Sequence, residues 1–247
     1  MSAYGDLNPG VAGLIVTQYP KIDTGIVQEA MTPGTPVFGY TNSDNKVWKL
    51  KADVSKLVFS ADLSASNSTV ITVNGVAAAA VVYATSHAAT MTAIINAIKV
   101  LTGVEAVLDS DDANGRTILV RTKGTTSTAS GVVTGGSAVT ITPTNGLYGQ
   151  VFRGILALRH LVPTTIGGSA SYAQYDAAPV VYNADIWAQA ASGVDSNEKA
   201  YVSVSTSVFA TSGVDIGVRT IVSRNSDGVG VVRVPSAPVA TTYADRF

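Results

Sequence analysis

Cysteine is absent from the 247 residues, and charged residues make up only 13% of them. Without cysteine the chain has no disulfide framework, no thiolate nucleophile and no cysteine-based zinc site. The charged share is half the usual ~25%, and 16 basic residues against 17 acidic ones leave a formal net charge of −1. Because a nucleic-acid-binding protein needs a basic face to neutralise phosphates, we expect no nucleic-acid partner.

Hydrophobic residues, at 46%, and small uncharged residues take the place of the missing charges. A free-standing soluble protein normally carries a mixed charged surface that keeps it dispersed. A surface rich in Ser, Thr, Gly and Ala suits a protein whose faces end up against neighbouring subunits. On composition alone, an ordinary secreted β-protein stays open as an alternative.

The sequence also lacks long apolar runs. No stretch approaches the roughly 18 uninterrupted apolar residues of a membrane span. The first residues, Met1–Asp6, have neither the basic start nor the apolar run of a signal peptide. We therefore expect a protein that is made in the cytoplasm and has no membrane partner.

Residues that carry catalysis are sparse. The two histidines, His87 and His160, are isolated, whereas a catalytic triad or a zinc site needs a base or several ligands together. No serine lies in a Gly-x-Ser-x-Gly elbow with plausible triad partners. The two tryptophans, Trp48 and Trp187, stand in strand-like surroundings that favour core packing. We expect no catalytic residue, no cofactor and no enzymatic activity.

The acidic run Asp109–Asp112 is the candidate for a cation site. A calcium-binding EF-hand loop needs oxygen ligands at positions 1, 3 and 5, glycine at 6 and glutamate at 12. Counted from Asp109, position 5 is Ala113 and position 12 is Val120, so the pattern fails. A solvated hairpin turn is the expected structure, and another kind of calcium loop stays open.

Proline and glycine punctuate the start of the chain, with short apolar pieces such as Val11–Val16 between them. Proline removes donors from a β-ladder and glycine loosens the backbone, so residues 1–20 are expected to form an extended arm. Ordering such an arm costs roughly 1–2 kcal/mol per residue in backbone entropy. We expect it to be mobile in the free protein and to become ordered against a neighbouring subunit.

We expect residues 56–147 to form an α+β domain with its elements in the order ββαββ. The β-branched run Thr69–Val73 meets the turn Asn74-Gly75, a pair that favours a hairpin with the following strand, Val76–Tyr83. A second hairpin is expected from Val104–Leu108 to Thr117–Val120. Further strands are expected around residues 131–133 and 138–141.

A helix is expected between these hairpins. Ser86 can cap its start, and Gly103 follows its last periodic residue. Its buried stripe consists of residues at helical spacing, namely Met91, Ile94, Ile95 and Ile98.

The rest of the chain, residues 1–55 and 148–247, is expected to form a β-sandwich or barrel core. Short strands alternate there with Gly, Pro, Ser and Asp turns. The expected strands of the second block are Val151–Leu158, Val180–Tyr182, Ile186–Ala188, Tyr201–Val204, Val218–Val222 and Val229–Val234.

The order of short motifs in this core resembles that of bacteriophage structural cement proteins, which decorate capsids. The motifs are a Gly/Pro arm, an acidic residue before Pro-Gly, a Phe-x-Gly strand, a Pro-Val strand and three later strands. Ala178 and Asp185 stand where the family pattern has glycine. The matching segments are Gly10–Ile15, Glu29-Ala30, Pro33-Gly34, Pro36-Val37, Phe152–Ala157, Tyr175–Val181, Ile186–Ala188, Ala200–Val202 and Val229–Val234.

The resemblance implies a jelly-roll-like core into which residues 56–147 are inserted. It further implies a virion protein on the capsid surface, made in the host cytoplasm, that binds the major capsid protein as a homo-oligomer (a dimer or trimer). Two alternatives remain open: another virion component, such as a head-fibre or tail-tube subunit, and a cell-surface adhesin or carbohydrate-binding module.

Overall fold

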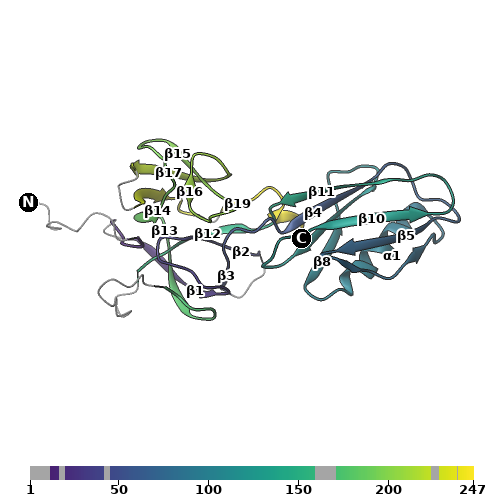
Figure 1. Ribbon diagram of the computed structural model, residues 1–247, viewed down its shortest axis with the longest axis horizontal. Helices are drawn as coiled ribbons and strands as arrows, with labels where there is room; N and C mark the ends of the chain where they lie inside the picture. The colour runs from purple at the N-terminus through teal and green to yellow at the C-terminus, as the bar shows by residue number, and fades with distance from the viewer. Residues whose placement is uncertain (1–11, 17–19, 42–44, 159–170, 224–227, 238) are drawn as a thin grey trace, which may run out of the picture. The chain divides into compact units, whose positions relative to one another are not determined.

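The computed structural model describes residues 12–16, 20–41, 45–158, 171–223, 228–237 and 239–247. The described chain is mainly β, with strands β1 to β19, one α-helix and a short 3-10 helix. It divides into two compact units, whose elements are labelled in Figure 1. Unit 1 comprises residues 1–50 and 150–241, and unit 2 comprises residues 51–149 and 242–247.

Unit 1 consists of two β-sheets. Its strands are β1 (Lys21–Val27), β2 (Pro36–Gly39), β3 (Lys46–Val47), β12 (Val151–Leu156), β13 (Ala177–Tyr182), β14 (Ala184–Gln189), β15 (Lys199–Val202), β16 (Phe209–Ala210), β17 (Val214–Val222), β18 (Val229–Val234) and β19 (Val239–Ala240).

The first sheet of unit 1 is barrel-like and nearly closed. β1 pairs with β13 and β3, β13 pairs with β12, and β12 pairs with β2. The ring is completed where Phe38 of β2 exchanges two backbone hydrogen bonds of 2.8 Å with Trp48, which follows β3. Such near-closure leaves less unpaired edge than an open sheet exposes.

The interior of this barrel-like sheet is apolar. Tyr172 is buried there, and its hydroxyl donates to the carbonyl of Ala157 at 2.7 Å, so the buried phenol keeps a hydrogen-bond partner. The buried cluster contains side chains from β1, β2, β3, β12 and β13 together with two loop residues: Val27, Met31, Val37, Val47, Leu156, Tyr172, Ala178 and Val180.

The second sheet of unit 1 is antiparallel, in the order β14-β18-β17-β15-β16. Its strands alternate between the two faces as a half-buried strand should: Ala184, Ile186 and Ala188 of β14 are buried, and the residues between them face outward. A single residue, Asn183, separates β13 of the first sheet from β14 of the second. Its φ of +52° lies in the left-handed region, which asparagine tolerates better than most residues.

Unit 2 contains two further sheets and the helix. One sheet has the order β11-β4-β9-β8, and in the other β5 pairs with β10, β6 and β7. The elements are β4 (Val54–Phe59), β5 (Ser68–Val73), β6 (Val76–Ala77), β7 (Val81–Val82), α1 (His87–Lys99), β8 (Val104–Leu108), β9 (Thr117–Thr122), β10 (Ala129–Thr134), β11 (Ile141–Leu147) and the 3-10 helix η1 (Ala244–Arg246).

The helix and both hairpins predicted for residues 56–147 are confirmed. The side chain of Ser86 caps α1 by accepting from the backbone N–H of Ala89, and Asn74 and Gly75 form a turn with positive φ at both residues. The prediction of a ββαββ unit is incomplete, however. The hairpins β5–β6 and β8–β9 lie in two different sheets. Strands β4, β10 and β11 complete those sheets.

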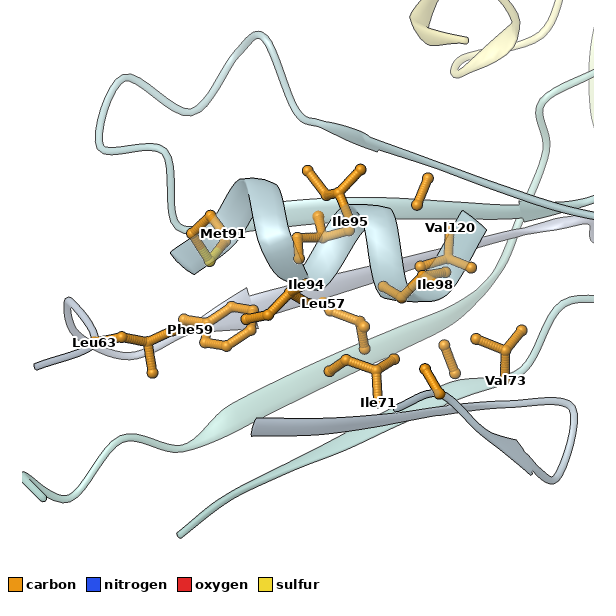
Figure 2. Packing of buried hydrophobic residues seen from close by; sticks show 14 of the residues in the cluster. Leu57, Phe59, Leu63, Ile71, Val73, Met91, Ile94, Ile95, Ile98 and Val120 are labelled. Atoms are coloured by element: carbon orange, nitrogen blue, oxygen red, sulfur yellow. The ribbon is translucent and has the colours of Figure 1, made fainter. Parts of the chain in front are cut away.

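The core of unit 2 lies between α1 and the two sheets. The expected stripe of α1 is buried, and Ile94 and Ile98 are at most 1% exposed. Figure 2 shows the side chains of α1 gathered with Leu57 of β4, Ile71 of β5 and Val120 of β9 in one cluster. The helical spacing of these apolar residues therefore places them on one face of α1, and that face packs in the core.

The C-terminal segment 242–247 packs in unit 2, whereas the sequence pattern assigned it to the β core. Ala244 is fully buried, and the backbone N–H of Tyr243 donates to the carbonyl of Tyr148 at 3.1 Å. Arg246 forms an ion pair with Asp111. These contacts join the segment to the loop after β8 and to the residues after β11.

Candidate functional site

The outer edge of β14 is occupied by a segment of the N-terminal region. Residues 13–16 lie antiparallel to β14, with an isolated bridge between Ile15 and Ile186. The backbone N–H groups of Gly13 and Val16 donate to the carbonyls of Trp187 and Asp185, at 2.7 and 2.8 Å. Adding an extended segment to a sheet edge in this way is a common mode of peptide recognition.

The same segment also contacts the residues that follow β12 of the first sheet. The carbonyl of Gly13 accepts from the backbone N–H of Leu158 at 2.9 Å. The expectation that residues 1–20 form a mobile arm is therefore wrong for residues 12–16, whose hydrogen bonds make them part of unit 1. The remainder of the predicted arm, residues 1–11 and 17–19, lies outside the described residues.

The acidic run forms the start of the loop between β8 and β9. Asp109, which is 5% exposed, accepts from the backbone N–H of Asp111 and pairs with the amine of Lys56 at 3.2 Å. Asp111 pairs with Arg246. Each of these two carboxylates therefore has a cationic side chain as its partner.

Asp112 organises the turn that follows. Its carboxylate accepts from the hydroxyl of Thr117 at 2.7 Å and from the backbone N–H groups of Asn114 and Arg116, at 3.0 and 2.9 Å. These hydrogen bonds, that from Thr117 above all, hold the pKa of Asp112 below its usual value, against the effect of partial burial. The carboxylates of Asp109, Asp111 and Asp112 all contact donors of the protein itself. The run thus forms the hairpin turn that the sequence predicts.

His87 stands at the start of α1, as expected. Its Nδ1 accepts from the backbone N–H of Leu63 at 3.0 Å, and its Nε2 lies 3.2 Å from the carbonyl of Gly115. These contacts suit a neutral imidazole with its proton on Nε2, which links two loops of unit 2. His160 lies outside the described residues.

The tryptophans lie in strands or beside them. The ring of Trp48 packs edge-on against Tyr40, with 5.0 Å between centroids, and its backbone closes the barrel-like sheet. Trp187 lies on β14 in register with Val231 of β18. Trp48 therefore serves the packing of unit 1, as the sequence pattern favours.

Metal-binding clusters and membrane-spanning helices are absent from the described residues. Among them, no group of three or more His, Cys, Asp or Glu side chains is arranged to hold a metal ion. The helices within the described ranges are all too short or too polar to cross a membrane.

Surface hollows occur in both units. A hollow of about 140 Å³ in unit 1 is lined by β1, β3 and Arg153. A larger one, of about 490 Å³, lies over β14, β17 and β18 and contains Arg219 and Arg233. No signal in the sequence predicted the larger hollow, because its residues come from strands that are distant in the chain.

No known family model matches the chain, and no curated protein is similar to it.

Proposed function

We propose that the protein is a structural component of a bacteriophage virion that binds the outside of the capsid and stabilises contacts between major capsid protein subunits. The observation that supports this proposal is where the cement-protein motifs fall. The segments Phe152–Leu156, Pro179–Val181 and Val229–Val234 of these motifs lie in β12, β13 and β18, and Ala157 directly follows β12. All of these strands belong to unit 1, as the core of one domain requires.

The proposal includes a jelly-roll-like core in unit 1, with unit 2 as an inserted domain. Low charge fits this role, since a surface covered by neighbouring subunits does not need charges to stay dispersed. Binding would be distributed over many modest contacts, repeated by the symmetry of the capsid, so that avidity replaces any single strong site. The proposed assembly is a homo-oligomer, either a dimer or a trimer.

Co-sedimentation with capsids that lack the protein tests the proposal. The purified protein should sediment with such capsids in a saturable manner, and gold-labelled antibody should mark capsids rather than tails in electron micrographs. Labelling of tails would assign the protein to the tail instead. Failure to bind either part would remove the virion role.

A further inference from the structure

A row of charged side chains crosses the outer face of the second sheet of unit 1. Asp185 of β14 is in register with Arg233 of β18, Arg233 with Arg219 of β17, and Arg219 with Lys199 of β15. Residues in register on neighbouring antiparallel strands lie on the same face. The row therefore places three cations side by side, and Arg219 is the middle one.

Both outer cations of this row have a carboxylate partner. The Nε and Nη2 of Arg233 donate to the two carboxylate oxygens of Asp185, at 2.8 and 2.9 Å. Lys199 pairs with Asp215 at 3.0 Å, and the hydrogen bond from the backbone N–H of Gly217 also holds that carboxylate in place. Among the described residues, no carboxylate pairs with Arg219.

The position of Arg219 is unfavourable without an anion from outside. Like charges directly opposite each other on a sheet destabilise it. The hydrogen bond and charge of Asp215 raise the pKa of Lys199, and the charge of Arg219 acts against that rise. An added carboxylate at Arg219 would relieve this repulsion.

The shape of the surface leaves room for such a carboxylate. Gly217 replaces a side chain on the outer face of β17 between Asp215 and Arg219, and a Cβ built there would meet nothing within 4 Å. The register of β17 shifts at this point. The hollow of about 490 Å³ described above is open here, with Arg219 and Arg233 in its lining.

We propose that this hollow receives a carboxylate side chain of a partner protein, and that Arg219 is the residue that binds it. Together with Asp215, the partner of Lys199, the row carries three cations (Lys199, Arg219 and Arg233) and two carboxylates (Asp185 and Asp215), so the net charge is +1. One carboxylate neutralises that charge. The planar guanidinium also matches a carboxylate through two parallel hydrogen bonds.

A nucleic acid or a sulfated polymer fits the site less well. Such polymers carry closely spaced charges and bind to surfaces that offer several unpaired cations. Here Asp185 and Asp215 would repel the neighbouring charges of the polymer. Resting on the proposed function, the inference assigns the carboxylate to an acidic residue of the major capsid protein.

The test compares three proteins: the intact protein, Arg219→Gln, and Lys21→Gln as a matched control. Lys21 is an exposed cation of β1 in unit 1 and does not line the hollow, so its replacement removes the same charge from outside the lining. Circular dichroism and the thermal midpoint first establish that all three fold alike. Binding to an immobilised, amidated peptide with a single glutamate among glycines and serines, with heparin as the sulfated comparison, then probes the site without any capsid.

Arg219→Gln should weaken binding to the single-glutamate peptide about tenfold, the size expected when a hydrogen-bonded charged partner is lost, and Lys21→Gln should not. Equal binding by all three proteins overturns the site. Tighter binding to heparin with the same dependence on Arg219 overturns the choice of a carboxylate.

Co-sedimentation with undecorated capsids separates the site from the proposed function. If the intact protein does not sediment while Arg219→Gln still weakens binding to the single-glutamate peptide, the carboxylate site stands and the capsid role fails. If the intact protein and Arg219→Gln sediment equally, the capsid role stands and the assignment of Arg219 to a capsid carboxylate is overturned.

Discussion

The guanidinium of Arg121 lies over the ring of Phe247, 4.2 Å from its centroid. Arg121 belongs to β9 and is 4% exposed, and its Nε donates to Glu105 of β8 at 2.8 Å. Burial raises the pKa of Glu105, but the hydrogen bonds from Lys123 and Arg121 lower it by more. The pKa of Glu105 therefore lies below its usual value. Phe247 thus stacks on the buried cation of a partly buried ion pair of unit 2.

Replacing Phe247 by alanine should destabilise unit 2. A cation–π contact contributes roughly 0.5–2 kcal/mol, and more when it is desolvated, so we expect a loss of that size in the free energy of unfolding. Phe247→Trp should retain the stability because indole is the best partner for a cation. Hydrogen exchange of the β9 amides measures the effect. The exposed Asp245 provides the control: a loss as large for Asp245→Asn would exclude the stacking explanation.

Removing unit 2 should leave unit 1 folded. The Nε2 of Gln150 lies 3.5 Å from the carbonyl of Lys49, and the hydroxyl of Thr241 donates to the carbonyl of Gln150 at 2.6 Å. The points where the chain leaves unit 1 therefore lie together, so a short Gly/Ser linker can join Leu50 to Gln150. We expect this protein, also truncated after Thr241, to keep its β circular dichroism.

The control for that deletion removes residues 56–147 instead, the bounds suggested by composition. It leaves Val54 and Ser55 of β4 without β9, their partner strand in unit 2, and we expect it to aggregate more readily. If both deletions are unfolded, unit 1 depends on unit 2.

The helix of unit 2 offers a test of its buried stripe. Ile98 is fully buried in the core cluster, so Ile98→Ala should lower the free energy of unfolding by ~2–5 kcal/mol, the usual range for such a cavity. Asn96 is exposed on the same helix, and Asn96→Ala should be nearly neutral. Urea unfolding measures both variants, and similar losses at the two positions would contradict the packing of α1.

Acid should weaken the loop between β8 and β9 through Asp112. Its folded pKa lies below the ordinary value of 3.8. The stabilisation is therefore complete above that value and is lost as the pH falls through the folded pKa. Asp112→Asn should be less stable than the intact protein at neutral pH and lose less stability on acidification. Thermal midpoints across the acid range measure this, and parallel curves for the two proteins would assign the acid sensitivity to other groups.

Local signals predicted the elements of unit 2 that depend on neighbours in the sequence. The Asn74-Gly75 hairpin and α1 follow from turn chemistry and helical periodicity. The boundary at residue 56 missed the first residues of β4 because the change in composition begins after that strand does. Nothing near Phe247 in the sequence indicates Arg121, since their contact joins residues that are remote in the chain.

Unit 1 likewise shows that local sequence patterns predict strands but not the contacts between remote residues. The strand around Val229–Val234 was predicted from its valines, and the structure confirms it as β18. The closure of the first sheet depends on the pairing of Phe38 with Trp48, which no local pattern specifies. The hollow around Arg219 likewise needs the register of β14, β17 and β18, so it could only be found in the structure.

Gly13 and Gly193 allow the role of the N-terminal strand segment to be tested with a matched pair. Both have a φ of +83°, so alanine is strained at either position. A Cβ at Gly13 would lie 2.5 Å from Cβ of Pro33 and 2.7 Å from the backbone nitrogen of Leu158, whereas at Gly193 the nearest atom, of Thr211, is 3.5 Å away. The strain is shared by the two sites, and the overlap is confined to Gly13.

Gly193→Ala should therefore cost about 1 kcal/mol, the usual size of left-handed strain. Gly13→Ala should cost that amount plus about 1–3 kcal/mol for overpacking, because the backbone of Leu158 cannot move aside without breaking its hydrogen bond to Gly13. Deleting residues 2–18 should also lower the thermal midpoint, because it removes the segment that covers the edge of β14. Thermal unfolding of the three variants decides the matter. A Gly13→Ala midpoint equal to that of Gly193→Ala, together with an unchanged midpoint for the deletion, would mean that the segment is dispensable to unit 1.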